Sequence, residues 1–237
     1  MTTQKEERMR LTGAYVAEFI GTFTLILVGA GSIIATHDMG GAAALVAIAL
    51  AHGFAIATMA SAFGAVSGGH FNPAVTLAML LGGHIKLRRA ASYMIAQLAG
   101  AVAGALALAY LFFPTAWRAA QLGTPMLASN VTGLQGMFIE AILTFFLVIV
   151  IHGTAVDKRA PKVGALFIGL TITMDILLGG PLTGAAMNPA RTFGPALASW
   201  LAGAPYNPWA GHLVYWIGPF LGAGVAQMVY AQFFHEE

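Results

Sequence analysis

The sequence of 237 residues contains no cysteine, and only 8% of its residues are charged. The absence of cysteine excludes disulfide scaffolds, thiolate metal sites and cysteine catalysis, although it leaves the redox compartment open. The formal net charge of +2 is too small to indicate a nucleic-acid partner. The sequence shows no nucleophile-base pair, metal-ligand cluster or phosphate-binding glycine loop. We therefore expect neither an enzyme nor a bound cofactor or metal.

The chain is instead rich in apolar sequence, because 58% of its residues are hydrophobic, far more than in a soluble domain. The polar N-terminal residues lead into an apolar run that is too long for a cleaved signal. The sequence therefore predicts an all-α, multi-pass integral membrane protein. Its six expected spans are Leu11–Ala35, Ala42–Gly64, Arg89–Phe113, Leu134–Gly153, Val163–Leu182 and Trp209–Phe234.

The basic residues predict the orientation of these spans. Most of the 11 Lys and Arg residues fall into three clusters that six spans place on one side of the membrane, and the positive-inside rule makes that side cytoplasmic. Both termini are then cytoplasmic. The short loops and the compact length favour a prokaryotic plasma membrane. The clusters are Lys5, Arg8 and Arg10, then Lys86, Arg88 and Arg89, then Lys158, Arg159 and Lys162.

One short motif occurs twice, as Asn72-Pro73-Ala74 and as Asn188-Pro189-Ala190. Asn is a preferred helix N-cap and Pro suits the first helical position, so each triplet predicts the start of a helix. A lone triplet would be most simply a helix cap in a loop, but two copies in matching apolar contexts favour half-helices inside the bilayer. At roughly 1.5 Å per residue, ten residues cover about 15 Å, half of the apolar core. Irregular backbone at that depth must line a water-filled cavity or be buried in protein.

The chain also repeats itself. Glu18 and Glu140 each open a Glu-x-x-x-Thr-Phe element, and Gly100 corresponds to Gly222 at the same shift of 122 residues. With three spans in each half, the second half inserts upside down, which is the inverted-repeat architecture. We expect one channel domain, 1–237. It comprises a first repeat, 11–113, with a half-helix at 72–82, an outer connecting loop, 114–133, and a second repeat, 134–234, with a half-helix at 188–200.

With these motifs the chain resembles the aquaporin, or major intrinsic protein, family over nearly its whole length. The resemblance rests on both Asn-Pro-Ala motifs, on the paired Glu-x-x-x-Thr-Phe elements, and on the longer strings 67–76 and 187–195. It implies six spans with two re-entrant half-helices, a single-file pore in each subunit, and a homotetramer. The expected partners are then water, small neutral solutes and the lipid bilayer.

In such a pore the amides of Asn72 and Asn188 would donate hydrogen bonds to water, while the two positive helix ends repel cations and interrupt proton hopping. Glu18 and Glu140 resemble the family's buried carboxylates that brace the two re-entrant loops; a proton relay is the weaker alternative. Backbone carbonyls along the file would act as acceptors, and they belong to Gly68, Gly69, His70, Gly184, Ala185 and Ala186.

By its spacing from the motifs, the family's selectivity filter corresponds to His52, Ile176, Ala185 and Arg191. This set resembles that of some plant vacuolar members, which also pass ammonia or urea. The glycerol branch typically has charged residues where this chain has Thr192 and Ala196. We therefore expect a water channel that excludes ions and protons and that also passes ammonia or other small neutral solutes.

A glycerol- or urea-type facilitator is the principal alternative to a water channel. A secondary transporter should carry coupling carboxylates at its midplane site, and a structural membrane protein would not need two half-helices.

We make separate predictions for three other ionisable residues. Asp175, inside a span, is expected to be protonated or hydrogen-bonded towards a neighbouring helix; alternatively it orients His52 and makes permeability pH-dependent. His84 and His152 are expected to be solvated loop histidines, with sensing of cytoplasmic pH as the alternative.

Overall fold

The computed structural model describes residues 4–234, and within this range the chain is helical and contains no strand, as the sequence predicts. The helices are α1 (Gln4–Thr24), a π-helical turn η1 (Leu25–Ala30), α2 (Gly31–Ala35), α3 (Gly41–Ser67), α4 (Pro73–Leu81), α5 (Leu87–Leu111), α6 (Pro114–Ala119), a short 3₁₀ turn η2 (Gln121–Gly123), α7 (Gly133–Ile151), a π-helical turn η3 (His152–Val156), α8 (Gly164–Thr183), α9 (Pro189–Leu201) and α10 (Val214–Phe233).

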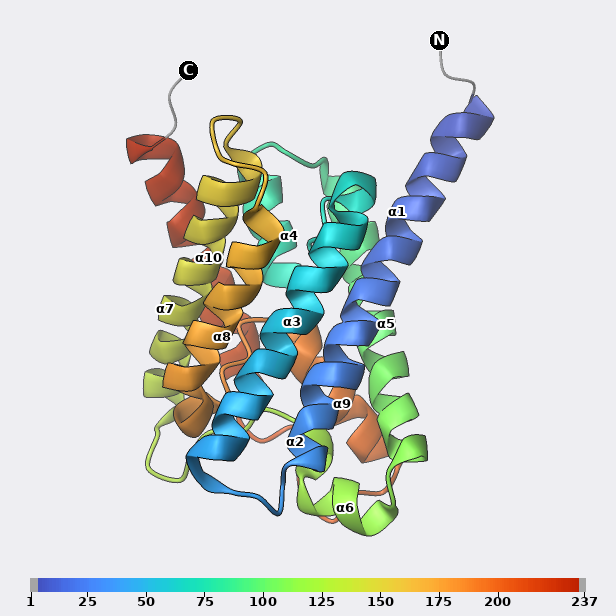
Figure 1. Cartoon of the computed structure of the whole chain (residues 1–237), viewed down its shortest axis with the longest axis vertical. Coiled ribbons are helices and arrows are strands. Elements are labelled where there is room, and N and C mark those ends of the chain that lie inside the picture. Colours follow the sequence, from blue (N-terminus) through green and yellow to red (C-terminus); the bar gives the residue numbers. More distant parts are fainter. Residues whose placement is uncertain (1–3, 235–237) are drawn as a thin grey trace.

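The long helices stand side by side along the long axis of the molecule (Figure 1). The start of α1 and the end of α10 lie at the same end of the bundle, which we call the terminal face. The α2–α3 connection and α6 lie at the other end, the distal face. The short helix α4 occupies the terminal half of the bundle and α9 the distal half, so neither crosses it.

Five helical segments in the described range are long and apolar enough to cross a membrane, and they match the first five expected spans. They are Met9–Ala35, Gly41–Ser67, Leu87–Leu111, Gly133–Val156 and Gly164–Thr183. The sixth expected span, Trp209–Phe234, becomes helical only at Val214, because residues 209–213 form turns. The resulting 20-residue helix α10 is not among the five, and its polar residues Tyr215 and Gln227 are buried inside the bundle.

Both half-helices begin where the motifs predict. Asn72 and Asn188 have extended backbones, and their side-chain oxygens accept hydrogen bonds from the first amides of the helix, Ala74 N at 2.8 Å and Ala190 N at 3.0 Å. These bonds supply an acceptor for backbone donors that the helix itself leaves unpaired. Helix α4 ends at Leu81 and α9 at Leu201, each within one residue of the expected end.

Glycines let equivalent helices approach closely in the two halves. Any side chain at Gly100 of α5 would collide with the carbonyl of Phe19 in α1, and any at Gly222 of α10 would collide with the carbonyl of Ala141 in α7. Gly100 to Gly222 and Phe19 to Ala141 are both shifts of 122 residues, so the same contact is built twice. Close backbone approach at small residues is a common mode of helix packing in lipid.

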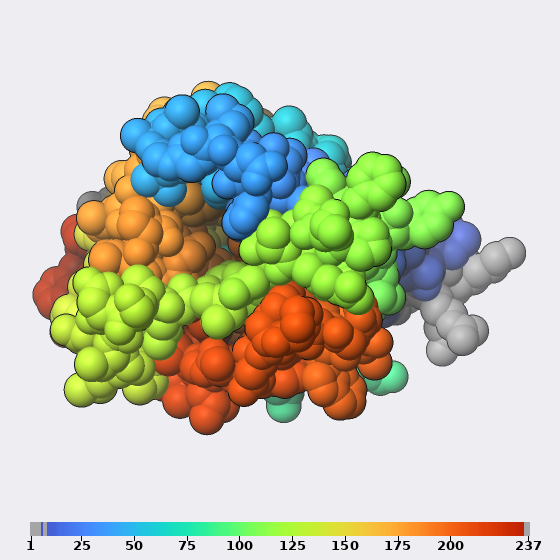
Figure 2. All heavy atoms as spheres, turned by 90° about the horizontal axis from the view of Figure 1, so that it is seen from below, coloured from blue at the N-terminus to red at the C-terminus, as the bar shows by residue number. Residues whose placement is uncertain are grey.

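The distal face, seen in Figure 2, is covered by the α2–α3 connection in blue, the segment around α6 in green and the residues after α9 in orange-red. A recess remains between the blue, green and orange segments. It lies over the interior of the bundle.

Candidate functional site

The first re-entrant loop, residues 68–72, is held by the buried carboxylate of Glu18 in α1. Its Oε1 accepts hydrogen bonds from Ser67 Oγ at 2.6 Å and His70 N at 3.0 Å, and its Oε2 accepts from Phe71 N at 2.7 Å. Backbone N–H groups that are buried on folding need such acceptors, because an unpaired buried donor is costly. The carboxylate therefore supplies the pairing that a helix or sheet would otherwise provide.

The second re-entrant loop, residues 184–188, is held in the same way by Glu140 of α7. Its Oε1 accepts from Thr183 Oγ1 at 2.6 Å and Ala186 N at 2.9 Å, and its Oε2 accepts from Met187 N at 2.6 Å. Both Glu18 and Glu140 are fully buried and contact the loops that the sequence assigns to them. These bonds engage both oxygens of each carboxylate.

Two tyrosines complete the anchoring, and sequence reasoning missed them. Tyr93 donates to the carbonyl of Ser67 and Tyr215 to that of Thr183, each at 2.7 Å. The signal was present, because Tyr93 and Tyr215 are related by the same shift of 122 residues as Glu18 and Glu140.

The two halves differ at one polar position. In the first half, Gln97 Nε2 donates to Glu18 Oε2 at 2.7 Å and to Thr76 Oγ1 at 2.9 Å. At the same shift of 122 residues the second half has Pro219, which has no amide to offer. The hydroxyl of Thr192, which corresponds to Thr76, is buried without a hydrogen-bond partner among the described residues.

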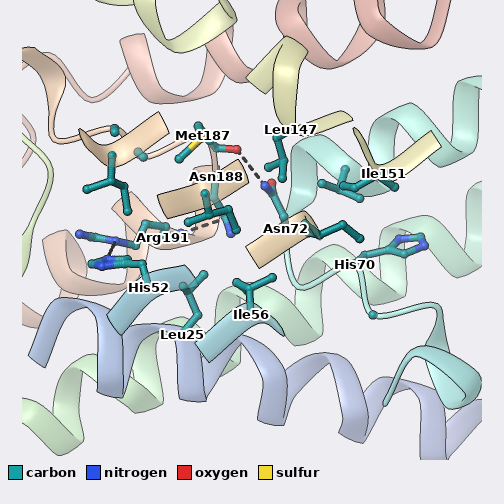
Figure 3. A pocket seen from close by; sticks show the side chains of 17 residues that line it. Leu25, His52, Ile56, His70, Asn72, Leu147, Ile151, Met187, Asn188 and Arg191 are labelled. Atoms are coloured by element: carbon teal, nitrogen blue, oxygen red, sulfur yellow. Dashed lines mark hydrogen bonds between the residues drawn. The ribbon is translucent and has the colours of Figure 1, made fainter. Parts of the chain in front are cut away.

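The two asparagines join the loops to each other at the middle of the bundle (Figure 3). Asn72 Nδ2 donates to Met187 O at 2.8 Å, the dashed line between these residues in Figure 3. Asn188 Nδ2 donates to Phe71 O at 3.0 Å. Phe71 and Met187 have positive φ angles of 50° and 51°, an uncommon backbone conformation for residues other than glycine. Each amide has two hydrogens, so one N–H of each asparagine is left after the bond to the opposite loop.

A narrow cavity runs past both asparagines, with a volume of about 30 Å³. One side of it is apolar, formed by side chains of η1, α3, α7 and α8: Leu25, Ile56 and Leu147 (Figure 3), together with Ile172. The other side is formed by the two re-entrant loops. Such a passage has room for small molecules only, and it offers them polar groups along one wall.

The four expected filter residues, His52, Ile176, Ala185 and Arg191, all line this central cavity. Arg191 Nε donates to His52 Nε2 at 3.1 Å, and His52 Nδ1 lies 2.8 Å from the carbonyl of Ile48. A carbonyl can only accept, so His52 carries its proton on Nδ1 and presents Nε2 to the arginine as an acceptor. The contact between His52 and Arg191 therefore joins a neutral ring to a cation.

The second partner of Arg191 comes from the outer loop and was missed by sequence reasoning. Arg191 Nη1 donates to the carbonyl of Gly123 at 2.8 Å. In this segment Gln121, Leu122 and Gly123 all have positive φ angles, which turns the chain inward. Two of these residues are not glycine, so the sequence carries no clear sign of this turn. Arg191 is only 2% exposed and has no carboxylate within ion-pair distance in the described part of the chain.

A second cavity, of about 250 Å³, adjoins the first on the side of the terminal face. Both are lined by Gly69, His70 and Val75, and the second adds Gly68 and Arg89. Of the expected carbonyl residues, Ala185 and Ala186 line the central cavity, whereas Gly184 lines neither and packs against Pro125. Because the two cavities share lining residues, the path past the asparagines continues towards the terminal face.

The remaining ionisable residues differ from their expectations in part. Asp175 is 1% exposed, and its Oδ2 accepts no hydrogen bond from the described residues. It does not orient His52, since both ring nitrogens of that histidine have other partners.

His152 is not a solvated loop histidine. It lies in η3, is only 2% exposed, and stacks on Tyr230 with 5.0 Å between the ring centroids. His84, by contrast, is exposed as expected.

Beyond the last turn of η3, Asp157 ties the α7–α8 connection to α10. Its Oδ2 accepts from Arg159 Nη2 at 2.6 Å and from Tyr230 Oη at 2.9 Å, and Arg159 Nη2 also donates to the carbonyl of Phe234. The hydrogen bonds from Arg159 and Tyr230 hold the pKa of the Asp157 carboxyl well below its usual range.

A bundle of long apolar helices, with two half-helices meeting at a polar passage, defines a membrane channel built from inverted repeats. The sequence profile of the family described as "Major intrinsic protein" matches residues 5–230, so the chain belongs to this family. It is an integral, multi-pass membrane channel and not an enzyme.

Comparison with individual proteins agrees with this assignment. The chain is 42% identical over 233 residues to "Probable aquaporin TIP3-2" of Arabidopsis thaliana, covering 92% of this chain and 82% of that protein. It is 43% identical over 226 residues to "Aquaporin TIP4-4" of Zea mays, covering 92% and 84% respectively. Among solved structures, the aquaglyceroporin from Plasmodium falciparum superimposes with a TM-score of 0.86 at 25% identity, covering 94% of this chain and 96% of that one.

Proposed function

We propose that the protein is a passive channel for water that excludes ions and protons. The observation that carries the proposal is the pair of asparagines: both line the central cavity, and each uses one N–H for the opposite loop, which leaves a second N–H available to water. A water molecule between them would accept two hydrogen bonds, so it would have to turn away from its neighbours in the file. A chain of hydrogen-bonded waters, which proton hopping needs, would be interrupted at this point.

Charge along the passage supports the exclusion of cations. The N-termini of α4 and α9 both point to the middle of the cavity and carry the positive ends of their dipoles. Arg191 adds a full charge at the filter, and no residue lining the central cavity is acidic. We assign the carbonyls of Gly69, His70, Ala185 and Ala186 as acceptors for the remaining waters of the file.

The filter also bears on the range of solutes. Ile176 and Ala185 line the same cavity as His52 and Arg191 but bring no hydrogen-bonding side chain to it. A small neutral solute such as ammonia can hydrogen-bond the polar groups of such a site, and its small size limits the polar surface that loses water beside Ile176 and Ala185. We propose ammonia as a second permeant. The two plant relatives described above, named as TIP aquaporins, support a water channel over a glycerol facilitator.

Two features of the assembly belong to the same proposal. We propose a homotetramer, a form that the family resemblance implies, with both termini on the cytoplasmic side, as the basic clusters predict. The suggestion of a prokaryotic plasma membrane rests on short loops and a compact chain alone. The relatives described above come from plants and give it no support.

The test is stopped-flow light scattering on proteoliposomes that contain the purified protein. Shrinkage in an impermeant osmolyte measures water permeability, re-swelling in glycerol or urea measures solute entry, and an internal pH dye measures ammonia. We expect fast shrinkage with a low activation energy and no glycerol entry. Shrinkage no faster than in empty liposomes, with glycerol entry present, would instead establish a solute facilitator.

A further inference from the structure

A π-helical turn interrupts the first membrane-crossing helix beside the filter. Residues Leu25–Ala30 form this turn, η1, between α1 and α2. A π turn inserts an extra residue into a helix and shifts the later residues around the helix axis, and such turns occur often at functional sites. Leu25, at its start, lines the central cavity, so the turn lies beside the passage (Figure 3).

Gly29 of this turn provides the surface on which His52 lies. A Cβ atom at Gly29 would stand 2.5 Å from His52 Cδ2 and 2.6 Å from His52 Nε2, distances at which one group must move. Nε2 is the same atom that accepts the hydrogen bond from Arg191. The glycine therefore allows the imidazole to lie against the helix backbone and leaves the lumen beside it open.

Ala30, the next residue, supports the other acceptor of Arg191. Gly123 packs so closely on Ala30 that a Cβ at Gly123 would lie 2.8 Å from both the Cβ and the carbonyl oxygen of Ala30. The carbonyl of Gly123 receives the bond from Arg191 Nη1. Two successive residues of the π turn thus each carry one of the two groups that hold the arginine.

We infer that η1 is a positioning and specificity-determining element of the channel: Gly29 and Ala30 set the places of His52 and Gly123, and through them the place of the Arg191 guanidinium. The inference rests on the proposed function, since it assigns the arginine to the filter. Arg191 has no carboxylate partner in the described part of the chain, so these two neutral acceptors determine where its charge stands.

An ordinary helix-packing role for Gly29 makes a different prediction. If Gly29 only let two helices approach, a methyl group there would disturb the bundle whatever residue stood at position 52. In the proposed role the methyl acts through the imidazole alone, because the three nearest atoms to it all belong to His52. Truncation of His52 should then remove the effect of the methyl group.

The experiment is a double-mutant cycle on water permeability, with Gly29→Ala, His52→Ala and the double variant reconstituted at equal protein-to-lipid ratio. Gly13→Ala is the matched control, because it lies in the same helix and its added Cβ meets nothing within 4 Å. We expect Gly29→Ala to lower water permeability at least about threefold in the wild-type background and to change it little in the His52→Ala background, which is a coupling typical of residues in contact.

Urea entry and proton leak are measured on the same vesicles, because a displaced arginine should alter them as well. Equal losses of water permeability in both backgrounds, or no loss in either, would overturn the inference. A wild-type protein that conducts no water would refute the proposed function instead, so the two failures are distinguishable. Tetramer elution and thermal unfolding of each variant show that the protein is folded.

Discussion

The carboxylate of Glu140 offers a quantitative test of how the second re-entrant loop is held. It accepts three hydrogen bonds, from Thr183 Oγ1 and from the backbone amides of Ala186 and Met187. In Glu140→Ala the hydroxyl can rotate to another acceptor, but the two amides remain buried without a partner. An unsatisfied buried donor costs about 1–3 kcal/mol, so the loss is about 2–6 kcal/mol.

For a chain of this size, each kcal/mol corresponds to about 2–4 °C in Tm, so Glu140→Ala should melt roughly 4–24 °C below the wild type. Glu140→Gln keeps one acceptor oxygen but turns an amide N–H₂ towards a donor, so we expect an intermediate fall of about 1–3 kcal/mol. The loop carries Asn188 and Ala185, so water permeability should fall in the same order. The assay is thermal unfolding in detergent at one scan rate, followed by tryptophan fluorescence, together with stopped-flow scattering.

Thr144→Val is the matched control for this prediction. Thr144 lies one turn further along α7 and donates only to the carbonyl of Glu140 within its own helix, at 2.7 Å. Its loss should cost no more than about 1 kcal/mol. If Glu140→Ala melted as late as Thr144→Val and conducted water normally, the carboxylate would not be what holds the loop.

Further predictions concern the filter, the packing and the terminal face. Arg191→Val should raise proton leak and urea entry while water still passes, because charge and bulk leave the filter; unchanged selectivity in the vesicle assays would contradict this. Gly194→Ala should lower the free energy of unfolding by about 1–3 kcal/mol, and Tm with it, since its Cβ would lie 2.5 Å from the backbone of Ala101; a Tm equal to that of Gly13→Ala would contradict it. The pKa of the Asp157 carboxyl is lower in the folded protein than in the unfolded one, so the ionised carboxylate stabilises the fold at every pH above the pKa of the unfolded state. This stabilisation is lost as the pH falls from there into strong acid. The Tm difference between the wild type and Asp157→Asn should therefore stay constant from about pH 5 to 8.

Much of this architecture could be predicted because it depends on local chemistry. Asn72 and Asn188 begin helices for the same reason in any context, namely that their side chains accept from the first amides. The shift of 122 residues related Glu18 to Glu140, and the resemblance to the family implied their bracing role; the same shift also relates Tyr93 to Tyr215. Apolar length alone located five of the membrane spans.

The residues that escaped prediction depend on tertiary contacts. The inward turn at Gly123 places two residues that are not glycine at positive φ, which no sequence pattern signals. The π turn at Leu25–Ala30 leaves the apolar composition of its helix unchanged, so hydropathy cannot reveal it. The burial of His152 accompanies its stacking on Tyr230, a residue of a different helix far along the chain. Each of these features forms only when distant segments meet.

The crossed asparagine bonds have a consequence for how the chain assembles during synthesis. Asn72 needs the carbonyl of Met187, and Asn188 needs the carbonyl of Phe71, so neither tip is completed by its own half of the sequence. The first half by itself supplies the bonds from Glu18, Thr22 and Tyr93 to the chain before Asn72, but not the bond between the two tips. The passage between the loops therefore reaches its final shape only when both halves, with Met187 and Asn188 of the second, are in place.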